Sequence, residues 1–589
     1  MKHFTTILLT IALVGCASGP NVIKSVDTWD SSKATAITQK IALLSDTQFH
    51  ESRGRPSRYF QRSGDEFEEV TIRSAQQVIG ADDILEHALD QARAFPLMLH
   101  AGDALDVSCS TEWARFTASM LRRGPPGPNT WLFTPGNHDG FAVGNIYPTA
   151  GTVWNEGYWN EVCNAGMIYI GGKYRHTSFG KNLVIDAYIK LFETSLSMKG
   201  DGISCNADES YCRKVHRDDS QPWRSFVVQM VKMPASDGSD IPVYGILIDS
   251  SDYALQPTLN YSGLAGLWAG VSSAQLEAAI GLRNRVPVQG KYFLLAHHPI
   301  KAWRTYGWLP GKSSVWQDLI SDYRSLRFIV TSHTHRGDFI RHSNIDGGLV
   351  ELNTGSLADA PIYIRTIQFE KGTKGEIGFR TAALNLNPTE FDCKTYVPSP
   401  PKGPLDYGVD TQRTERAKGA ESSWLVRNLR SLGSAWRSFL NIDDAKHDEL
   451  RPQLLAYADI VQRTFPEEQV FAYKWTSTED APGYALDEIS GRGALIERLR
   501  SLANCRPSDG TSKCTIQAKE NILLELDSKY RSKSSIPKED LEYAHRMRLC
   551  MALSAADDSP SVVEKVSIEA LRKRIEENWS IQLSPQAKP

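Results

Sequence analysis

Short apolar runs alternate with amphipathic stretches between residues 37 and 386. The runs are rich in Leu, Ile, Val and Phe, and each has the length of one buried strand. They read KIALLSD, PLMLHAGD, TWLFTPGN, VYGILIDSS, KYFLLAHHP, RFIVTSHTH and LVELNTGS. The stretches between them have the amphipathic spacing of helices that cover a sheet. This pattern predicts an α/β domain over residues 37–386.

In five of these runs, Asp, Asn or His residues follow the apolar residues directly. Ligand sites of open α/β sheets form at the carboxyl ends of the strands, so five such coincidences predict one shared site. The polar residues concerned are Asp46, Gln48, His50, Asp103, Asp106, Asn137, His138, Asp139, His297, His298, Ser332, His333 and His335. Carboxylates, imidazoles and an amide oxygen form a ligand set for two divalent cations. A carboxylate has two oxygens and can bridge both cations.

The amino terminus predicts a targeting segment rather than part of the fold. Lys2 and His3 precede an apolar stretch at residues 7–14, which is far shorter than the ~20 residues that span a bilayer. The sequence Leu-Val-Gly-Cys at residues 13–16 resembles a bacterial lipobox. The resemblance implies a signal peptide at residues 1–15, lipid on Cys16 and a tether at residues 16–36. Ala17 in place of Asp favours a periplasmic lipoprotein of the outer membrane, and an ordinary secretory signal is the alternative.

The cysteine count agrees with an oxidising compartment. The 589-residue chain has nine cysteines, and removing Cys16 leaves an even number that permits four disulfides. Two pairs, Cys205 with Cys212 and Cys505 with Cys514, are close enough in sequence to be local. Pairing among the other cysteines stays open, as do buried free thiols; they are Cys109, Cys163, Cys393 and Cys550. The near-balance of 66 basic and 69 acidic residues gives no reason to expect nucleic acid as a partner.

Two further parts of the chain differ from the α/β pattern. Residues 140–240 are rich in Gly, Tyr, Trp and Asn and predict an insertion or cap over the sheet edge, with a carbohydrate- or lipid-facing surface as a weaker interpretation. A Pro-rich linker is predicted at residues 387–407. Beyond it, apolar residues recur at spacings of three and four, as at Leu495, Ile496, Leu499 and Leu502. Residues 408–589 are therefore predicted to be mainly helical.

The ordered blocks SDTQ, GDALD, GNHD, AHHP and SHTH resemble the calcineurin-like metallophosphoesterase superfamily. The resemblance covers residues 37–386 and implies an α/β/β/α sandwich of two mixed sheets flanked by helices. It implies that Asp46, Gln48 and His335 hold a first metal, that Asp103 bridges, and that Asn137, His297 and His333 hold a second. His138 would face the substrate, with Asp139 behind it to fix its tautomer. Asp106 would be a hydrogen-bond partner behind the ligands rather than a ligand, and His298 is the less certain ligand of the two adjacent histidines.

Two positions depart from the superfamily pattern. Gln48 stands where His is usual, and because a carboxamide oxygen is a harder and weaker ligand, the first position is predicted to favour manganese, magnesium or iron over zinc. His50 is an alternative nitrogen ligand. Ser332 replaces a glycine with little expected effect. Four arginines near these motifs predict either contacts to an anionic substrate group or solvated loops; they are Arg53, Arg55, Arg58 and Arg336.

The resemblance implies a metal-dependent phosphoric ester hydrolase in which a hydroxide bridging two cations attacks phosphorus. The expected substrates are phosphomonoesters or phosphodiesters among small molecules, lipids or glycans, reached by a protein tethered to the bacterial envelope. The alternative is a catalytically idle lipoprotein that serves as an envelope scaffold or binding module. The presence of Asp103, Asn137 and His138 favours the enzyme.

Overall fold

The computed structural model describes residues 33–49, 58–63, 66–72, 75–106, 108–140, 180–199, 201–220, 224–251, 269–300, 303–304, 314–335, 337, 339–342, 348–359, 362–386, 442–476, 484–506, 514–531, 542, 544–550 and 579–582. Several predicted features lie outside these residues, namely the signal peptide, Cys16, His50, Arg53, Arg55, Arg336, residues 141–179 and the linker at residues 387–407. For Arg58, only the backbone is described.

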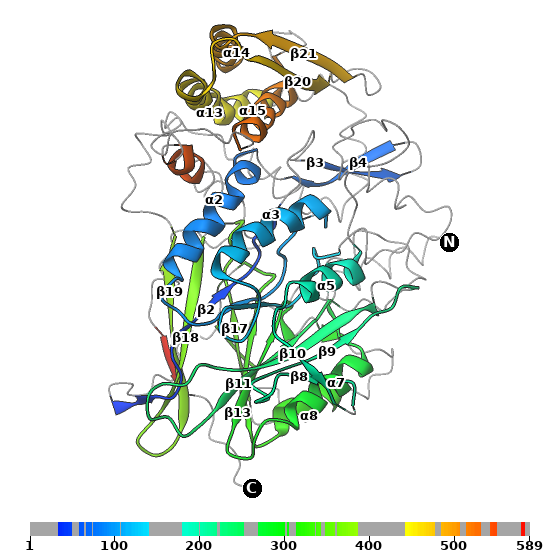
Figure 1. The fold of residues 1–589 in the computed structure, drawn as a ribbon, viewed down its shortest axis with the longest axis vertical. Helices are drawn as coiled ribbons and strands as arrows, with labels where there is room; N and C mark the ends of the chain where they lie inside the picture. The colour runs from blue at the N-terminus through cyan, green and yellow to red at the C-terminus, as the bar shows by residue number, and fades with distance from the viewer. Residues whose placement is uncertain are drawn as a thin grey trace, which may run out of the picture.

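Two mixed sheets form the centre of the protein (Figure 1). The first has the strand order β22-β19-β18-β2-β5-β6, with β1 paired to β18. Its strands are β1 (Thr35–Ala36), β2 (Ile41–Leu44), β5 (Met98–His100), β6 (Trp131–Phe133), β18 (Tyr363–Lys371), β19 (Ile377–Asn385) and β22 (Trp579–Gln582). Strands β2, β5 and β6 are parallel, so their carboxyl ends meet at one edge.

The second sheet has the order β16-β17-β15-β13-β11-β10-β9-β8-β7. Its strands are β7 (Ser197–Met198), β8 (Ser204–Cys205), β9 (Tyr211–His216), β10 (Phe226–Lys232), β11 (Val243–Ile248), β13 (Lys291–Ala296), β15 (Ser325–Thr331), β16 (Phe339–His342) and β17 (Leu349–Asn353). Strands β11, β13, β15 and β17 are parallel. Their carboxyl ends therefore form a second set of loops on one side of the sheet.

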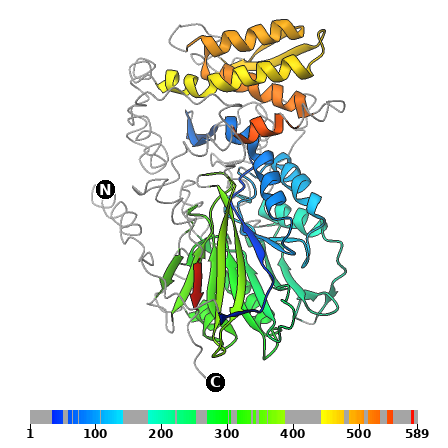
Figure 2. The ribbon, with the colours of Figure 1, turned by 90° about the vertical axis from the view of Figure 1, so that its left-hand side faces the viewer.

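Alternation along the strands builds the layers. In β2, Ile41 and Leu43 join the core between the two sheets, whereas Ala42 and Leu44 join the core on the outer face. Helices α2 (Ala75–Gln91), α3 (Ser110–Met120) and α5 (Lys181–Lys190) cover that outer face. Helices α7 (Ser273–Arg283) and α8 (Ser314–Ser321) cover the other sheet. The predicted α/β/β/α sandwich is confirmed, and Figure 2 shows its sheets with helices on their outer side.

Residues 180–232 belong to the sandwich itself rather than to a cap. They supply α5 and the strands β7 to β10 at one edge of the second sheet. The apolar strand β10 is interrupted by Gln229, whose side chain is buried because Tyr188 and Tyr211 donate to its Oε1 at 3.0 and 2.9 Å. Because a polar residue interrupts the apolar run, the sequence pattern does not predict this strand. The predicted disulfide between Cys205 and Cys212 is present and joins β8 to β9.

The carboxyl-terminal part forms a unit with its own apolar core beyond α2 (Figure 1). It contains helices α13 (Ile442–Thr464), α14 (Arg492–Asn504) and α15 (Ile516–Arg531). All four apolar residues of the predicted stripe in α14 are buried. The unit also contains a hairpin, β20 (Val470–Thr476) and β21 (Tyr484–Ser490), which the sequence pattern does not predict. The chain then contributes β22, which pairs with β19 of the first sheet.

Disulfides and one ion-pair cluster hold this unit. The predicted bond between Cys505 and Cys514 is present, and Cys109 and Cys550 are also disulfide-bonded. Asp83 of α2 accepts two hydrogen bonds from Arg548, at 2.8 and 3.0 Å, and contacts His545 Nδ1 at 2.7 Å. Both Asp83 and Arg548 are buried. The unit is therefore fixed to the helical layer of the sandwich by a charged contact as well as by apolar packing.

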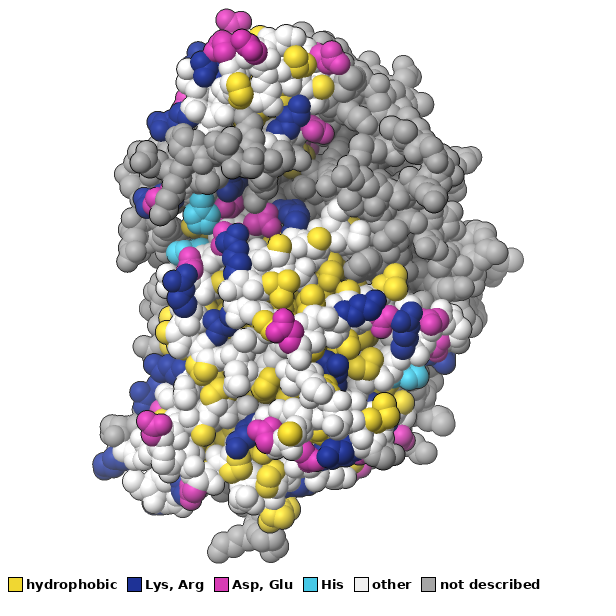
Figure 3. Space-filling model, viewed as in Figure 1, with side chains coloured by type: hydrophobic (Ala, Val, Ile, Leu, Met, Phe, Trp, Pro, Cys, Tyr) yellow, Lys and Arg dark blue, Asp and Glu magenta, His cyan; other side chains and the backbone are white. Residues whose placement is uncertain are grey.

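The described surface in Figure 3 mixes basic and acidic side chains over one face, in line with the balanced composition. Among helices in the described residues, none combines the length and the apolar character needed to cross a membrane.

Candidate metal centre

The loops that follow β2 and β5 run side by side and are paired by backbone hydrogen bonds. The N–H groups of Asp46 and Gln48 donate to the carbonyls of Gly102 and Asp103 at 2.9 and 3.0 Å. Glycine is required where the loops pass each other. A Cβ on Gly136 would lie 2.2 Å from Asp103 Oδ1, and a Cβ on Gly102 would lie 2.7 Å from His297 Nδ1. The glycines of the GDALD and GNHD blocks thus allow close approach of the polar loops.

Unusual backbone conformations gather at these loops. Of the eight non-glycine residues with positive φ in the described parts of the chain, five are predicted ligands: Asp46, Gln48, Asp103, His333 and His335. A left-handed conformation costs a non-glycine residue about 1–2 kcal/mol. Such backbone strain is concentrated at functional sites, where the surrounding structure holds the strained residue in place. The backbone therefore points to the same residues as the sequence motifs.

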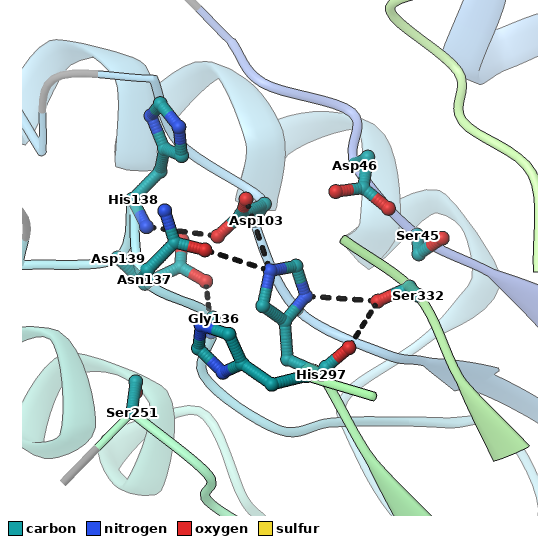
Figure 4. A network of polar contacts seen from close by, with 12 residues as sticks. Ser45, Asp46, Asp103, Gly136, Asn137, His138, Asp139, Ser251, His297 and Ser332 are labelled. Atoms are coloured by element: carbon teal, nitrogen blue, oxygen red, sulfur yellow. Dashed lines mark hydrogen bonds and ion pairs between the residues drawn. The ribbon is translucent and has the colours of Figure 1, made fainter. Parts of the chain in front are cut away.

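Asp103 lies at the centre of the polar cluster (Figure 4). Its Oδ2 is 3.1 Å from His297 Nε2 and 3.5 Å from Gln48 Nε2, while its Oδ1 accepts from the backbone N–H of His138 at 2.8 Å. Asn137 Oδ1 lies 2.9 Å from the same His297 nitrogen. Burial raises the pKa of Asp103, but the facing imidazoles of His297 and His138 outweigh it and hold the pKa below its usual value. Asp103 is thus an anion that faces several ligand groups.

Asp46 and His335 form the other side of the cluster. Asp46 Oδ1 is 3.0 Å from His335 Nε2, and the second oxygen of this buried carboxylate, Oδ2, has no hydrogen-bond partner among the described residues. His335 Nδ1 contacts Asp359 Oδ2 at 2.8 Å, which leaves Nε2 directed at Asp46. Burial lowers the pKa of His335, but the two carboxylates raise it to about 10. Sequence reasoning misses Asp359, although a carboxylate shortly after the LVELNTGS run could have been considered.

The structure reassigns the partner of His138. The sequence places Asp139 behind this ring, but Asp139 accepts from the backbone N–H groups of Gly136 and Leu105 at 2.8 and 3.0 Å. The N–H of Ala104 also donates to this carboxylate, at 3.3 Å. The ring Nδ1 instead lies 2.7 Å from the carbonyl oxygen of Asp106 and 3.3 Å from its Oδ1. Asp106 therefore orients His138, and Asp139 fixes the loops.

The pKa of His138 follows from these contacts. Burial lowers it, but Asp103 and Asp106 outweigh the burial and raise the pKa to about 9. Burial raises the pKa of Asp139 to about 7, and the nearby charge of Asp103 adds to the effect. The contacts with Asp103 and Asp106 thus favour the protonated form of the ring.

Two further histidines are held neutral. Burial lowers the pKa of His333 to about 3, with the neighbouring His297 adding to the effect. His298 is fully buried, and burial together with His333 holds its pKa well below the usual value. A neutral imidazole has a lone pair available for a metal ion.

Buried polar side chains support the loops from behind. The hydroxyl of Ser332 donates to the carbonyl of Ala101 at 2.8 Å and lies 2.8 Å from His297 Nδ1, so this replacement of glycine adds a contact to a predicted ligand. Glu351 Oε1 accepts from Thr331 Oγ1 at 2.6 Å and from the N–H of Ile300 at 3.3 Å. It therefore joins the end of β15 to the loop after β13. The sequence motifs contain no signal for this role of Glu351.

The donor set fits divalent cations. One ligand atom each from Asp46, Asp103 and His297 lies within 4.8 Å of the others, and the same holds for His297, His298 and His333. The two groups share His297. The buried Asp46 Oδ2, which has no hydrogen-bond partner in the described parts of the chain, is an anionic position that a cation would satisfy. Carboxylate, amide and imidazole donors in adjoining groups are suited to two cations with Asp103 between them.

A family description, calcineurin-like phosphoesterase, matches residues 39–337 of the chain. Among solved structures, the purple acid phosphatase PPD1 from yellow lupin (Lupinus luteus) seeds is 9% identical, with a TM-score of 0.30. The match covers 59% of this chain and 52% of the lupin protein, so the chain spans about half of that protein's length. GAP50, the anchor in the inner membrane complex of Plasmodium, is 10% identical with a TM-score of 0.25, over 60% of this chain and 85% of that one. A search of curated proteins gave no match.

Proposed function

Because the chain belongs to the calcineurin-like phosphoesterase family, we propose that it is an active hydrolase of phosphoric esters with two divalent cations at Asp103. One observation carries the proposal. Asp103 has one carboxylate oxygen 3.1 Å from His297 and 3.5 Å from Gln48, which belong to the two predicted ligand sets. An idle relative has no need to keep such a buried, charged arrangement, which is costly without a cation.

The ligand assignment divides the residues into two positions that share Asp103. The first would be held by Asp46, Gln48 and His335, and the second by Asn137, His297 and His333. Divalent cations at these positions supply Lewis acidity toward phosphoryl oxygens and lower the pKa of bound water. The first position has more oxygen donors, so we propose manganese, magnesium or iron there.

The side chains supply orientation and a proton. Asp106 accepts at Nδ1 of His138, so Nε2 is the ring nitrogen that we propose faces the substrate. Asp106 also favours the protonated ring, and a protonated His138 can donate to the leaving-group oxygen. Asp359 keeps His335 Nε2 directed at Asp46.

We further propose that the enzyme is tethered to the outer membrane on its periplasmic side through lipid on Cys16. The lipobox-like residues 13–16 and the short apolar stretch before them support this location. A phosphorylated small molecule, lipid or glycan of the envelope is the proposed class of substrate. The balanced charge of the chain supports these classes over nucleic acid.

Hydrolysis of a nitrophenyl phosphomonoester beside its diester analogue tests the proposal. The protein is assayed with manganese, magnesium, zinc or chelator, together with Asp103→Ala and His138→Ala. We expect metal-dependent turnover that both substitutions abolish or reduce by at least about 100-fold. The absence of turnover with any metal and either ester, in folded protein, would refute the proposed activity and favour an idle scaffold.

A further inference from the structure

The ring nitrogen Nε2 of His298 is buried beside the metal centre without a contact, in the described parts of the chain, that accounts for its burial. The side chain is fully buried, and its Nε2 has no hydrogen-bond partner among the described residues. Its other ring nitrogen, Nδ1, lies 3.0 Å from Ser250 Oγ, which also accepts from the His298 backbone N–H at 2.9 Å. Ser250 thus contacts both the backbone and the ring of His298 and orients Nδ1. The unpartnered nitrogen is directed by the fold rather than left by a mobile side chain.

The neighbours of His298 are other ring nitrogens. One ring nitrogen from each of His297, His298 and His333 lies within 4.8 Å of the other two. The ring centroids of His298 and His333 are 4.6 Å apart, and those of His298 and His297 are 4.8 Å apart. Nitrogens bound to one tetrahedral zinc ion lie about 3.3–3.4 Å apart, since each Zn–N bond is about 2.0–2.1 Å. Small ring rotations would bring the three nitrogens to one ion.

We propose that His298 is a third imidazole ligand of the second metal position, beside His297 and His333, with Ser250 as the residue that orients it. This inference rests on the proposed function, because it assumes that cations occupy the centre. Ser250 occupies Nδ1, so Nε2 is the nitrogen left for the ion. The AHHP block thus supplies two ligands rather than one.

The added ligand makes the two positions chemically unequal. The second position has three imidazoles, whereas the first has the single imidazole of His335 with oxygen donors from Asp46 and Gln48. Nitrogen donors favour zinc over manganese or magnesium, and oxygen donors favour the harder ions. The second position therefore retains zinc, and the first takes manganese or magnesium. The site is a mixed-metal centre.

A pair of substitutions separates ligation from support of the fold. In His298→Asn, the amide takes the place of Nδ1 and keeps a group for Ser250, but nothing remains at Nε2. In His298→Gln, the amide reaches the position of Nε2. His447→Asn is the matched control, because His447 is also buried but lies in α13, outside the two sheets whose loops form the centre. The folded state of each full-length variant is checked by thermal unfolding.

Zinc affinity is measured by competition with a chromophoric chelator, and the number of imidazoles on bound zinc by X-ray absorption at the zinc edge. We expect His298→Asn to raise the zinc dissociation constant at least about tenfold and to lower the imidazole number from three to two. His298→Gln should recover part of the affinity, and His447→Asn should match the parent protein. Manganese binding at the first position, followed by electron paramagnetic resonance, should be unchanged in all three.

Parent-like zinc affinity and imidazole number in His298→Asn would overturn the inference and leave the proposed hydrolase intact. Failure of the parent protein to bind any divalent cation would overturn the proposed function as well. An equal loss of zinc in His298→Asn and His447→Asn would also overturn the inference, because it would reflect damage to the fold.

Discussion

Replacing Asp359 by Asn tests whether a residue outside the sequence motifs controls the first metal position. Asp359 Oδ2 is 2.8 Å from His335 Nδ1, and the opposite ring nitrogen is 3.0 Å from Asp46 Oδ1. The substitution keeps an oxygen that can accept from Nδ1 but removes the negative charge. His335 then becomes a weaker electron donor and its ring is less firmly oriented.

The magnitude follows from the position of the contact. The side chains of His335 and Asp359 are only 14% and 12% exposed, so water replaces the lost interaction poorly. Loss of such a partner typically reduces metal affinity or activity by about 10- to 100-fold, which corresponds to about 1.4–2.8 kcal/mol. The effect should fall on the first position, and the ion at the second position should stay bound.

The assay is a manganese titration of chelator-treated protein, with bound metal and ester hydrolysis measured on the same samples. Asp322→Asn is the matched control, since the side chain of Asp322 is also 12% exposed and pairs with Arg324 at 2.8 Å. Asp322 precedes β15, whereas the predicted ligands follow the other end of that strand. Parent-like manganese affinity in Asp359→Asn would refute the reasoning. An equally large loss in Asp322→Asn would show that the effect is not local.

Three other substitutions test separate parts of the account. Gly136→Ala places a Cβ 2.2 Å from Asp103 Oδ1. We expect thermal unfolding to show a stability loss of about 1–3 kcal/mol and metal analysis to show loss of bound metal. A variant that retains two metals would contradict this prediction. Asp83→Ala removes the carboxylate that accepts two hydrogen bonds from the buried Arg548. The free energy of unfolding, measured in urea, should fall by about 3–5 kcal/mol. A decrease below about 1 kcal/mol would argue against a stabilising contact. Cys16→Ser should abolish incorporation of labelled palmitate in a bacterial host, and undiminished labelling would exclude this anchor.

The sequence predicts the convergence of the centre because of a simple geometric rule. Parallel strands have their carboxyl ends at one edge, so polar residues that follow β2, β5 and β6 gather in the first sheet and those that follow β13 and β15 gather in the second. The packing of the two sheets then brings both groups together, as the contact of Asp103 with His297 shows. The alternation of Ile41 and Leu43 with Ala42 and Leu44 likewise sets the layers of the sandwich. These features depend on local pattern and on the order of elements.

Features that depend on individual turns or on distant contacts are not predicted. The exchange of roles between Asp106 and Asp139 depends on which backbone amides face each carboxylate, and residue spacing does not encode that direction. Asp359 and Ser250 contact metal-site histidines from loops without a motif. Strand β22 joins the first sheet from the far end of the chain, and a four-residue strand has too few positions to show a period.

The most direct test of the central claim is a titration of chelator-treated protein with divalent metal, in which ester hydrolysis is plotted against the number of ions bound per chain. The account predicts that activity appears with the second ion, that two ions bind in total, and that Asp103→Ala neither binds the pair nor gains activity. Full activity with one ion, or activity that survives complete removal of metal, would contradict a centre of two cations held at Asp103.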